Sequence, residues 1–146
     1  MIGLIQRVTH ASVDVAGERI AEIGPGMLLL VGVTREDTEQ HAEKLAHRLL
    51  GYRIFEDSAG KMNLSLNDTA GGHRLVPQFT LAADTKKCMR AGFSRGAPPH
   101  LAKKLFDYLV THMKAQHSGD FGTGQFGADM AVSLVNDGPV TFWIEI

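Results

Sequence analysis

The C-terminal segment from Phe126 to Ile146 constrains the fold more than any other part of the chain. It contains two apolar runs suited to strands, and the second run begins at Val140. Between them stands the tetrapeptide Asn136-Asp137-Gly138-Pro139. Asp-Gly between two such runs is a strong hairpin signal because glycine tolerates positive φ, and proline is accepted as the first residue of a strand. The segment therefore predicts two strands joined by a tight hairpin turn.

The bond between Gly138 and Pro139 is also an X-Pro bond, the kind of peptide bond for which the cis form costs little. One interpretation is an ordinary hairpin turn. The alternative is a rigid turn whose two outward-facing carbonyls serve as a binding surface. Taken by themselves, these residues favour the ordinary turn.

The size and composition of the chain are those of one globular domain. It has 146 residues, of which 44% are hydrophobic and 21% charged. No apolar run approaches the roughly 20 residues of a transmembrane helix, and the N-terminus lacks the pattern of a signal peptide. The single cysteine, Cys88, cannot form an internal disulfide, which fits a reducing compartment. We therefore expect a cytoplasmic protein without a membrane partner.

The first third of the chain has β character. Three strands are expected, at 4–15, 19–23 and 27–33, separated by turns that contain glycine. We expect them to form a β-meander. Shorter strands are expected at 52–55, 61–66 and 74–83, the last of them interrupted by Pro77.

Two amphipathic helices are expected among these strands. The first follows Asp37, whose spacing to Gln40 resembles a capping box. Its apolar stripe consists of Ala42, Leu45, Ala46 and Leu49. The second helix opens at Pro98-Pro99. Together these patterns predict a single α+β domain over residues 1–146, mainly antiparallel, with two helices.

No conventional catalytic constellation stands out. The histidines lack metal-ligand spacing, and one cysteine cannot build a structural zinc site, so we expect no metal or other cofactor and no effect of chelators. The glycine-rich stretch 119–127 lacks the Gly-Lys-Ser/Thr ending of a P-loop. Cys88 is more simply structural than nucleophilic. Thr80 carries a hydroxyl, but the sequence offers no obvious base to activate it.

A local excess of cations stands between residues 84 and 104, where Asp84 is the only acid. The cations are Lys86, Lys87, Arg90, Arg95, Lys103 and Lys104. The formal net charge of the whole chain, −1, argues against a nucleic-acid coat protein. The basic stretch is either a solvated face or a contact for a modest nucleic-acid partner.

Two separated motifs resemble the signatures of D-aminoacyl-tRNA deacylases, also called D-tyrosyl-tRNA deacylases. They are Leu75-Val76-Pro77-Gln78-Phe79-Thr80-Leu81 and Asn136-Asp137-Gly138-Pro139-Val140-Thr141, and they occur in the family's order. The N-terminal strand at 1–8 and the segment 123–130 are similar as well, so the resemblance runs along almost the whole chain. The family usually has serine where this chain has Pro77, and a related branch with relaxed chiral selectivity has proline there.

The resemblance implies a homodimer of β-barrel-like protomers with active sites at the subunit interface. It implies hydrolysis of the ester between a D-amino acid and the terminal adenosine of tRNA, with L-aminoacyl-tRNA spared and glycyl-tRNA, including glycine mischarged on tRNA-Ala, accepted. By position, the resemblance assigns the catalytic pocket to Gln78, Phe79 and Thr80 and the adenosine pocket to Phe126 and Met130.

The pair Gly138-Pro139 matches the family motif that contains a cis peptide and enters the partner's pocket. Two parallel carbonyls from such a bond could hold the substrate's amino group and crowd an L side chain, whereas glycine would escape rejection. Backbone N–H groups near Phe79-Thr80 could form an oxyanion hole, and the vicinal ribose hydroxyl could assist. This chemistry requires no strong side-chain acid or base.

Two alternatives remain open at this point. The chain could be a module that binds RNA ends or nucleotides without chemistry, as the basic stretch and the missing acid/base pair would allow. It could also be a hydrolase of the same fold that uses Thr80 as a nucleophile.

Overall fold

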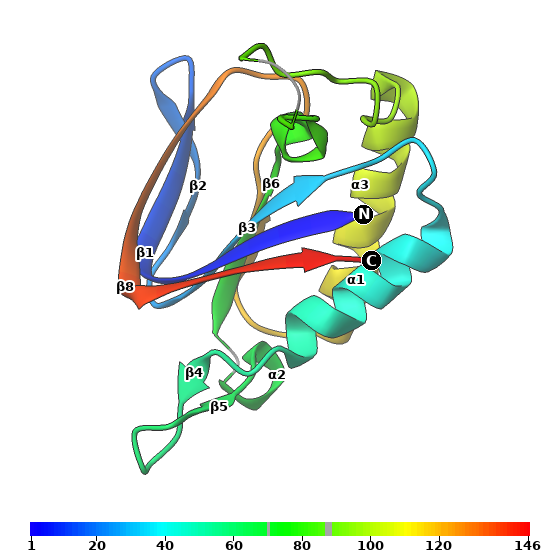
Figure 1. Ribbon diagram of the computed structural model, residues 1–146. Helices are drawn as coiled ribbons and strands as arrows, with labels where there is room; N and C mark the ends of the chain where they lie inside the picture. The colour runs from blue at the N-terminus through cyan, green and yellow to red at the C-terminus, as the bar shows by residue number, and fades with distance from the viewer. Residues whose placement is uncertain (70, 87–88) are drawn as a thin grey trace.

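The two ends of the chain lie side by side in the computed structural model (Figure 1), where the Ile146 amide donates to the Met1 carbonyl over 3.0 Å. The structure describes residues 1–69, 71–86 and 89–146, so Lys87 and Cys88 fall outside the described residues. Within these ranges, no helix has both the length and the apolar character needed to cross a membrane.

Strand β1 (Ile2–Val15) organises the main sheet. On one edge it pairs antiparallel with β2 (Glu18–Ile23) and β3 (Gly26–Gly32), and on the other with β8 (Met130–Glu145). The three strands expected in this region are confirmed, but the β-meander is wrong. Gly24 and Pro25 form a bend and not a reversal, so β3 continues in the direction of β2 along the same edge of β1.

The other half of the main sheet is parallel. Strand β3 pairs with β6 (Gly72–Pro77), and β6 pairs with β7 (Phe121–Thr123), both in parallel register. The sheet is therefore mixed, although its long pairings are antiparallel as predicted. Parallel neighbours require crossover connections, which the helical segments supply here. The sheet curls into a nearly closed barrel, which brings β2 close to β6 and β7 (Figure 1).

The predicted C-terminal hairpin is wrong. Strand β8 runs unreversed along β1, with Asn136 opposite Val8 and Thr141 opposite Gln6. Between these two pairs β8 advances by five residues, whereas β1 advances by only two. Residues 137–140 therefore form a wide bulge in a continuous strand. The Asp-Gly signal is local and does not specify the path of the chain beyond the turn. Here the residues after the bulge pair with β1, as do the residues before it.

Two long helices, α1 (Glu39–Gly51) and α3 (Pro99–Gln116), confirm the two helices expected, and they pack against each other on one side of the sheet (Figure 1). The residue that caps α1 is Thr38, bonded to the His41 ring, and not Asp37. The carboxylate of Asp37 instead meets the Met1 amino group at 2.5 Å. Two short helical turns, α2 (Leu66–Thr69) and η1 (Phe79–Ala82), were not expected.

The core has two parts. The larger lies between the helices and the sheet and includes the whole predicted stripe of α1. The smaller lies inside the curl of the sheet and contains Val8, Ala11, Val13, Ala21, Ile23, Leu28 and Val76. A small hairpin of β4 (Phe55–Glu56) and β5 (Met62–Leu64) extends beyond this body. The described residues thus form one α+β domain with a barrel-like mixed sheet.

Candidate functional site

A cavity of about 450 Å³ opens where β6 ends. It is lined by the end of β6, by η1, by the start of α3 and by the segment that enters β8. Its lining residues are Val76, Pro77, Gln78, Phe79, Ala97, Pro99, Ala102, Phe126, Gly127, Ala128, Asp129, Met130 and Val132. The structure therefore brings together two of the predicted catalytic residues, Gln78 and Phe79, and both residues predicted to hold adenosine, Phe126 and Met130.

The turn that follows β6 is held in place by its neighbour β3. Pro77 ends the strand, and the Gln78 amide donates to the Val31 carbonyl over 2.7 Å. Turn η1 then packs directly on Gly32, where an added Cβ would lie 2.9 Å from that of Leu81. Only glycine allows this close approach, and it fixes the start of η1 at the cavity.

Gln78, Phe79 and Thr80 present polar groups at this turn. The Gln78 side-chain amide donates to the Thr80 hydroxyl over 2.6 Å. Phe79 and Thr80 occupy the first turn of η1, where a helix leaves backbone N–H groups without intrahelical partners. Such N–H groups can stabilise an oxyanion. Asp129, which the sequence analysis missed, is the one ionisable side chain in the cavity lining among the described residues.

The opposite wall of the cavity is apolar. Phe126 lies at 6.3 Å, ring centre to ring centre, from Phe106 of helix α3. Met130 lies against Gly124, where an added Cβ would come within 2.7 Å of its sulfur. An apolar wall that contains an aromatic ring suits the face of a nucleobase.

The bulge in β8 is tightly organised although it is exposed. The Asn136 side chain accepts a hydrogen bond from the Val140 amide over 2.6 Å and donates to the Thr141 hydroxyl over 2.9 Å. Gly138 has φ +134°, and an added Cβ would lie 2.7 Å from a methyl group of Val140. The Gly138-Pro139 peptide bond is cis, as expected.

Arg7 connects this bulge to the rest of the molecule, a role that the sequence did not reveal. Its buried guanidinium donates to the carbonyls of Ile54, over 2.8 Å, and of Asp137, over 3.1 Å. Strand β1 also contains other polar residues, such as Gln6, His10 and Asp14, so no pattern in the sequence distinguished Arg7 from them. Gly138 and Pro139 are exposed and do not line the cavity of their own chain.

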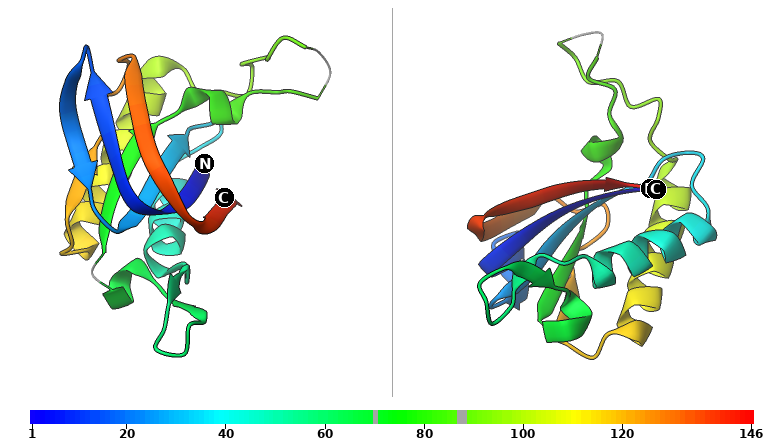
Figure 2. Two further views of the ribbon diagram at one scale, coloured as in Figure 1. Left: turned by 90° about the vertical axis from the view of Figure 1, so that its left-hand side faces the viewer. Right: turned by 60° about the horizontal axis from the view of Figure 1, so that its bottom comes forward.

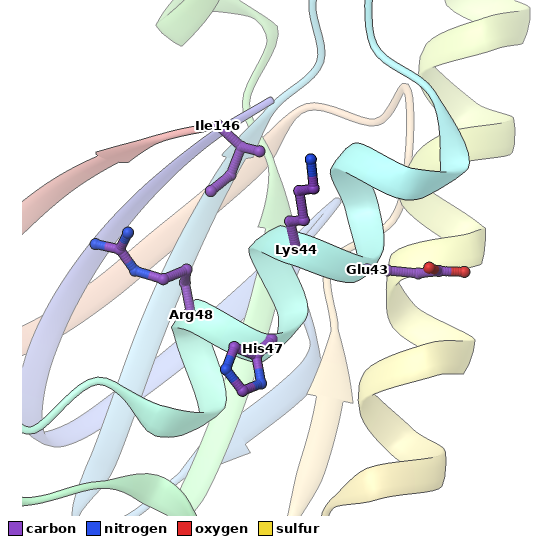
Figure 3. Close-up of a pocket in the computed structure, with 5 residues that line it drawn as sticks. All are labelled: Glu43, Lys44, His47, Arg48 and Ile146. Atoms are coloured by element: carbon purple, nitrogen blue, oxygen red, sulfur yellow. The ribbon is translucent and has the colours of Figure 1, made fainter.

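A second concavity, of about 410 Å³, lies on the outer face of α1 beside the C-terminus (Figure 3). It is lined by Glu43, Lys44, His47, Arg48 and Ile146, none of which the sequence analysis selected. It is wide and shallow, and the Glu43 carboxylate is engaged by the Tyr108 hydroxyl at 2.6 Å. Nothing in this lining matches the chemistry of the first cavity.

A buried histidine pair lies at the start of β6. The rings of His73 and His117 are 4.7 Å apart, centre to centre, and Phe121 is equally close to His73. Burial lowers the pKa of His73 to about 4, and the neighbouring His117 and Arg74 add to the shift. Among the described residues, no group of three or more His, Cys, Asp or Glu side chains could hold a metal ion.

Several cations of the basic stretch are paired with acids. The pairs join Arg95 with Glu145 at 2.9 Å, Lys103 with Asp107 at 2.5 Å and Lys104 with Glu39 at 2.9 Å. Lys86 and Arg90 are exposed and form no ion pair within the described part of the chain. The basic character of this stretch therefore rests mainly on the loop that precedes α3.

A sequence model of the family described as D-Tyr-tRNA(Tyr) deacylase matches residues 4–145. The chain belongs to this family. Relatives named D-aminoacyl-tRNA deacylase are similar over its full length. The protein from Thioalkalivibrio sulfidiphilus (strain HL-EbGR7) is 61% identical over 100% of this chain and 97% of its own length. A protein from Pseudomonas putida (strain ATCC 700007 / DSM 6899 / JCM 31910 / BCRC 17059 / LMG 24140 / F1) is 58% identical over the full length of both.

Solved structures repeat the deacylase-family fold. The "c-Myc DNA Unwinding Element Binding Protein" superposes with a TM-score of 0.96 at 35% identity, covering 100% of this chain and 99% of its own. A structure titled as a probable eukaryotic D-amino acid tRNA deacylase superposes with a TM-score of 0.86 at 16% identity, covering 99% of this chain and 98% of its own. This second likeness concerns the fold alone. The family resemblance seen in the sequence is thus confirmed.

Proposed function

We propose that this protein hydrolyses the ester bond of D-aminoacyl-tRNA and so removes D-amino acids before translation uses them. The observation that carries the proposal is the cavity that joins Gln78 and Phe79 to Phe126 and Met130, in a chain of the deacylase family. Its apolar wall would receive the terminal adenosine, and its polar turn would receive the ester carbonyl.

The reaction would depend on positioning. Water would add to the ester carbonyl carbon, the bond to the ribose oxygen would break, and that oxygen would leave with a proton. The amides of Phe79 and Thr80, at the first turn of η1, would stabilise the oxyanion. Thr80 already accepts a hydrogen bond from Gln78, and none of the described histidines lines the cavity to act as its base. This favours backbone and substrate groups over a threonine nucleophile.

We propose further that the protein acts as a homodimer, in the cytoplasm, where the single cysteine would stay reduced. Gly138 and Pro139 lie on an exposed bulge outside their own cavity, and within the described ranges β8 is paired on one edge only, with β1. Exposed Val135 and Trp143 on β8 add apolar surface for a second copy. The partner's bulge would then complete each cavity.

Chiral selection would follow from this arrangement. Carbonyls of the Gly138-Pro139 bulge would hold the substrate's amino group and crowd an L side chain, whereas glycine has no side chain to exclude. D-aminoacyl-tRNA and glycyl-tRNA would therefore be substrates.

Deacylation of D-tyrosyl-, L-tyrosyl- and glycyl-tRNA by the purified protein tests the proposal. We expect turnover of the D and glycyl esters and survival of the L ester. Equal rates on the two tyrosyl esters would disprove chiral selection. Binding of uncharged tRNA without turnover of any ester would instead identify a module that holds RNA ends.

A further inference from the structure

Two phenylalanine side chains form an exposed pair at the mouth of the cavity. The rings of Phe79 and Phe93 lie 5.2 Å apart, centre to centre, and are tilted by 53°. Their exposed fractions, 67% and 48%, are unusual for side chains of this size. Phe79 belongs to the cavity lining, so the pair continues the apolar wall outward to the surface.

The backbone around Phe93 is anchored. The Gly96 amide donates to the Phe93 carbonyl over 3.1 Å, which closes a tight turn. This turn is joined to the end of β3 by hydrogen bonds from Ala97 to Val33 and from Arg35 to Arg95, both of 3.0 Å. Phe93 is thus presented by a fixed turn, although the segment that carries it projects from the body of the molecule (Figure 2).

Positive charge lies along the same segment. Lys86 and Arg90 precede Phe93 and are exposed, without an ion pair among the described residues, whereas Arg95, which follows Phe93, is paired with Glu145. Exposed aromatic rings and cations on one segment are a combination suited to single-stranded nucleic acid, because bases stack on rings while cations attract phosphates. A purely apolar partner would leave the charges of Lys86 and Arg90 without a role.

We propose that Phe79 and Phe93 form a stacking platform for the unpaired nucleotide that precedes the terminal adenosine of the tRNA. This inference rests on the proposed function and deepens it. The terminal adenosine would occupy the cavity, and the preceding base would lie on the exposed ring of Phe93. Phe93 would strengthen binding of the RNA end without contacting the ester.

The test compares two substrates that differ only in the RNA. D-tyrosyl-tRNA contains the preceding nucleotide, whereas 2′(3′)-O-D-tyrosyl-adenosine lacks it. In Phe93→Leu, which keeps an apolar side chain without an aromatic face, we expect KM for D-tyrosyl-tRNA to rise on the order of 10-fold with kcat unchanged. KM for D-tyrosyl-adenosine should stay at the wild-type value. Phe93→Trp should behave as the wild type on both.

Met62→Leu is the matched control, since Met62 is similarly exposed but lies on the distant β5 hairpin. An equal change on both substrates in Phe93→Leu would overturn the platform, because Phe93 would then act on the cavity or on subunit contacts. No change on either substrate would overturn it too.

A direct binding measurement separates this inference from the proposed function. A fluorescent ACCA oligoribonucleotide should bind Phe93→Leu about 10-fold more weakly than the wild type or Phe93→Trp. Equal binding by all three proteins would overturn the platform. If the wild type hydrolyses neither ester, the proposed function fails, and the oligonucleotide result still decides the platform.

Discussion

The guanidinium of Arg7, on the first strand, donates to the carbonyl of Asp137, on the last, over 3.1 Å, and this bond holds the peptide that precedes Gly138. The same group bonds the Ile54 carbonyl over 2.8 Å. A rigid fork of donors is suited to two acceptors that lie apart, whereas a lysine ammonium on a flexible chain is not. The bulge is therefore fixed by a residue far away in sequence.

We expect Arg7→Lys to lower the free energy of unfolding by about 2 kcal/mol, because at least one buried carbonyl loses its charged donor. It should also slow turnover of D-tyrosyl-tRNA about 10-fold by loosening the bulge. Urea denaturation and single-turnover deacylation measure the two effects. Arg19→Lys, at an exposed arginine that bridges Asp14 and Glu22, should change neither quantity. Full activity of Arg7→Lys would show that the bulge needs no such anchor.

A side chain at position 138 should affect turnover before it affects folding. In Gly138→Val the valine backbone would have to adopt φ near +134°, and its side chain would meet Val140. This strain would destabilise the folded state by about 1–3 kcal/mol. The exposed bulge can shift to relieve part of this strain, but its carbonyls would then be displaced. We expect a loss of D-tyrosyl-tRNA hydrolysis of at least about 100-fold in a protein that still unfolds cooperatively. Unchanged turnover in the folded variant would exclude the bulge from selection.

Thr80→Ala should keep substantial activity, within about 10-fold of the wild type, because backbone groups and substrate geometry are proposed to carry the reaction. The variant also removes the acceptor for the Gln78 amide, which accounts for a moderate loss. Loss of a true nucleophile would reduce turnover by many orders of magnitude. A folded Thr80→Ala protein without detectable turnover would favour covalent catalysis.

The buried His73 should make the protein sensitive to acid. Its pKa is lowered to about 4 in the folded state, so the unfolded chain takes up the proton first as pH falls. The contribution of neutral His73 to the free energy of unfolding is fully present above about pH 6.5. It is lost progressively towards about pH 4, by up to about 3 kcal/mol. His73→Phe should remove this part of the pH dependence, and the exposed control His10→Phe should retain it. If the free energy of unfolding of the two variants depended on pH in the same way, His73 would not be the source of the acid sensitivity.

Local patterns predicted the helices and most strands, because an apolar stripe such as that of α1 is sufficient to define a buried face. They could not predict which strands pair. Whether β3 lies beside β2 or beside β6 depends on contacts across the whole fold. The hairpin prediction failed for the same reason, since Asn136 to Pro139 have turn chemistry whether the chain reverses or bulges.

The candidate site shows the same division. Resemblance predicted its site residues, and the structure places four of them, Gln78, Phe79, Phe126 and Met130, around one cavity. Arg7 was missed because its partners Ile54 and Asp137 are remote in sequence. Asp129 was missed because a lone carboxylate in a loop is usually a solvated one.

Strand β8 contributes Met130 to the cavity of its own chain and carries the Gly138-Pro139 bulge outside that cavity. In the proposed dimer, each active site would therefore combine one strand's beginning with the other strand's middle. Met130→Lys and Gly138→Val would each be inactive alone. Mixed and allowed to exchange subunits, they would form hybrid dimers in which one of the two sites has both parts intact. Recovery of D-tyrosyl-tRNA hydrolysis on mixing would reveal this intersubunit complementation, and no recovery despite demonstrated exchange would place both parts in one chain.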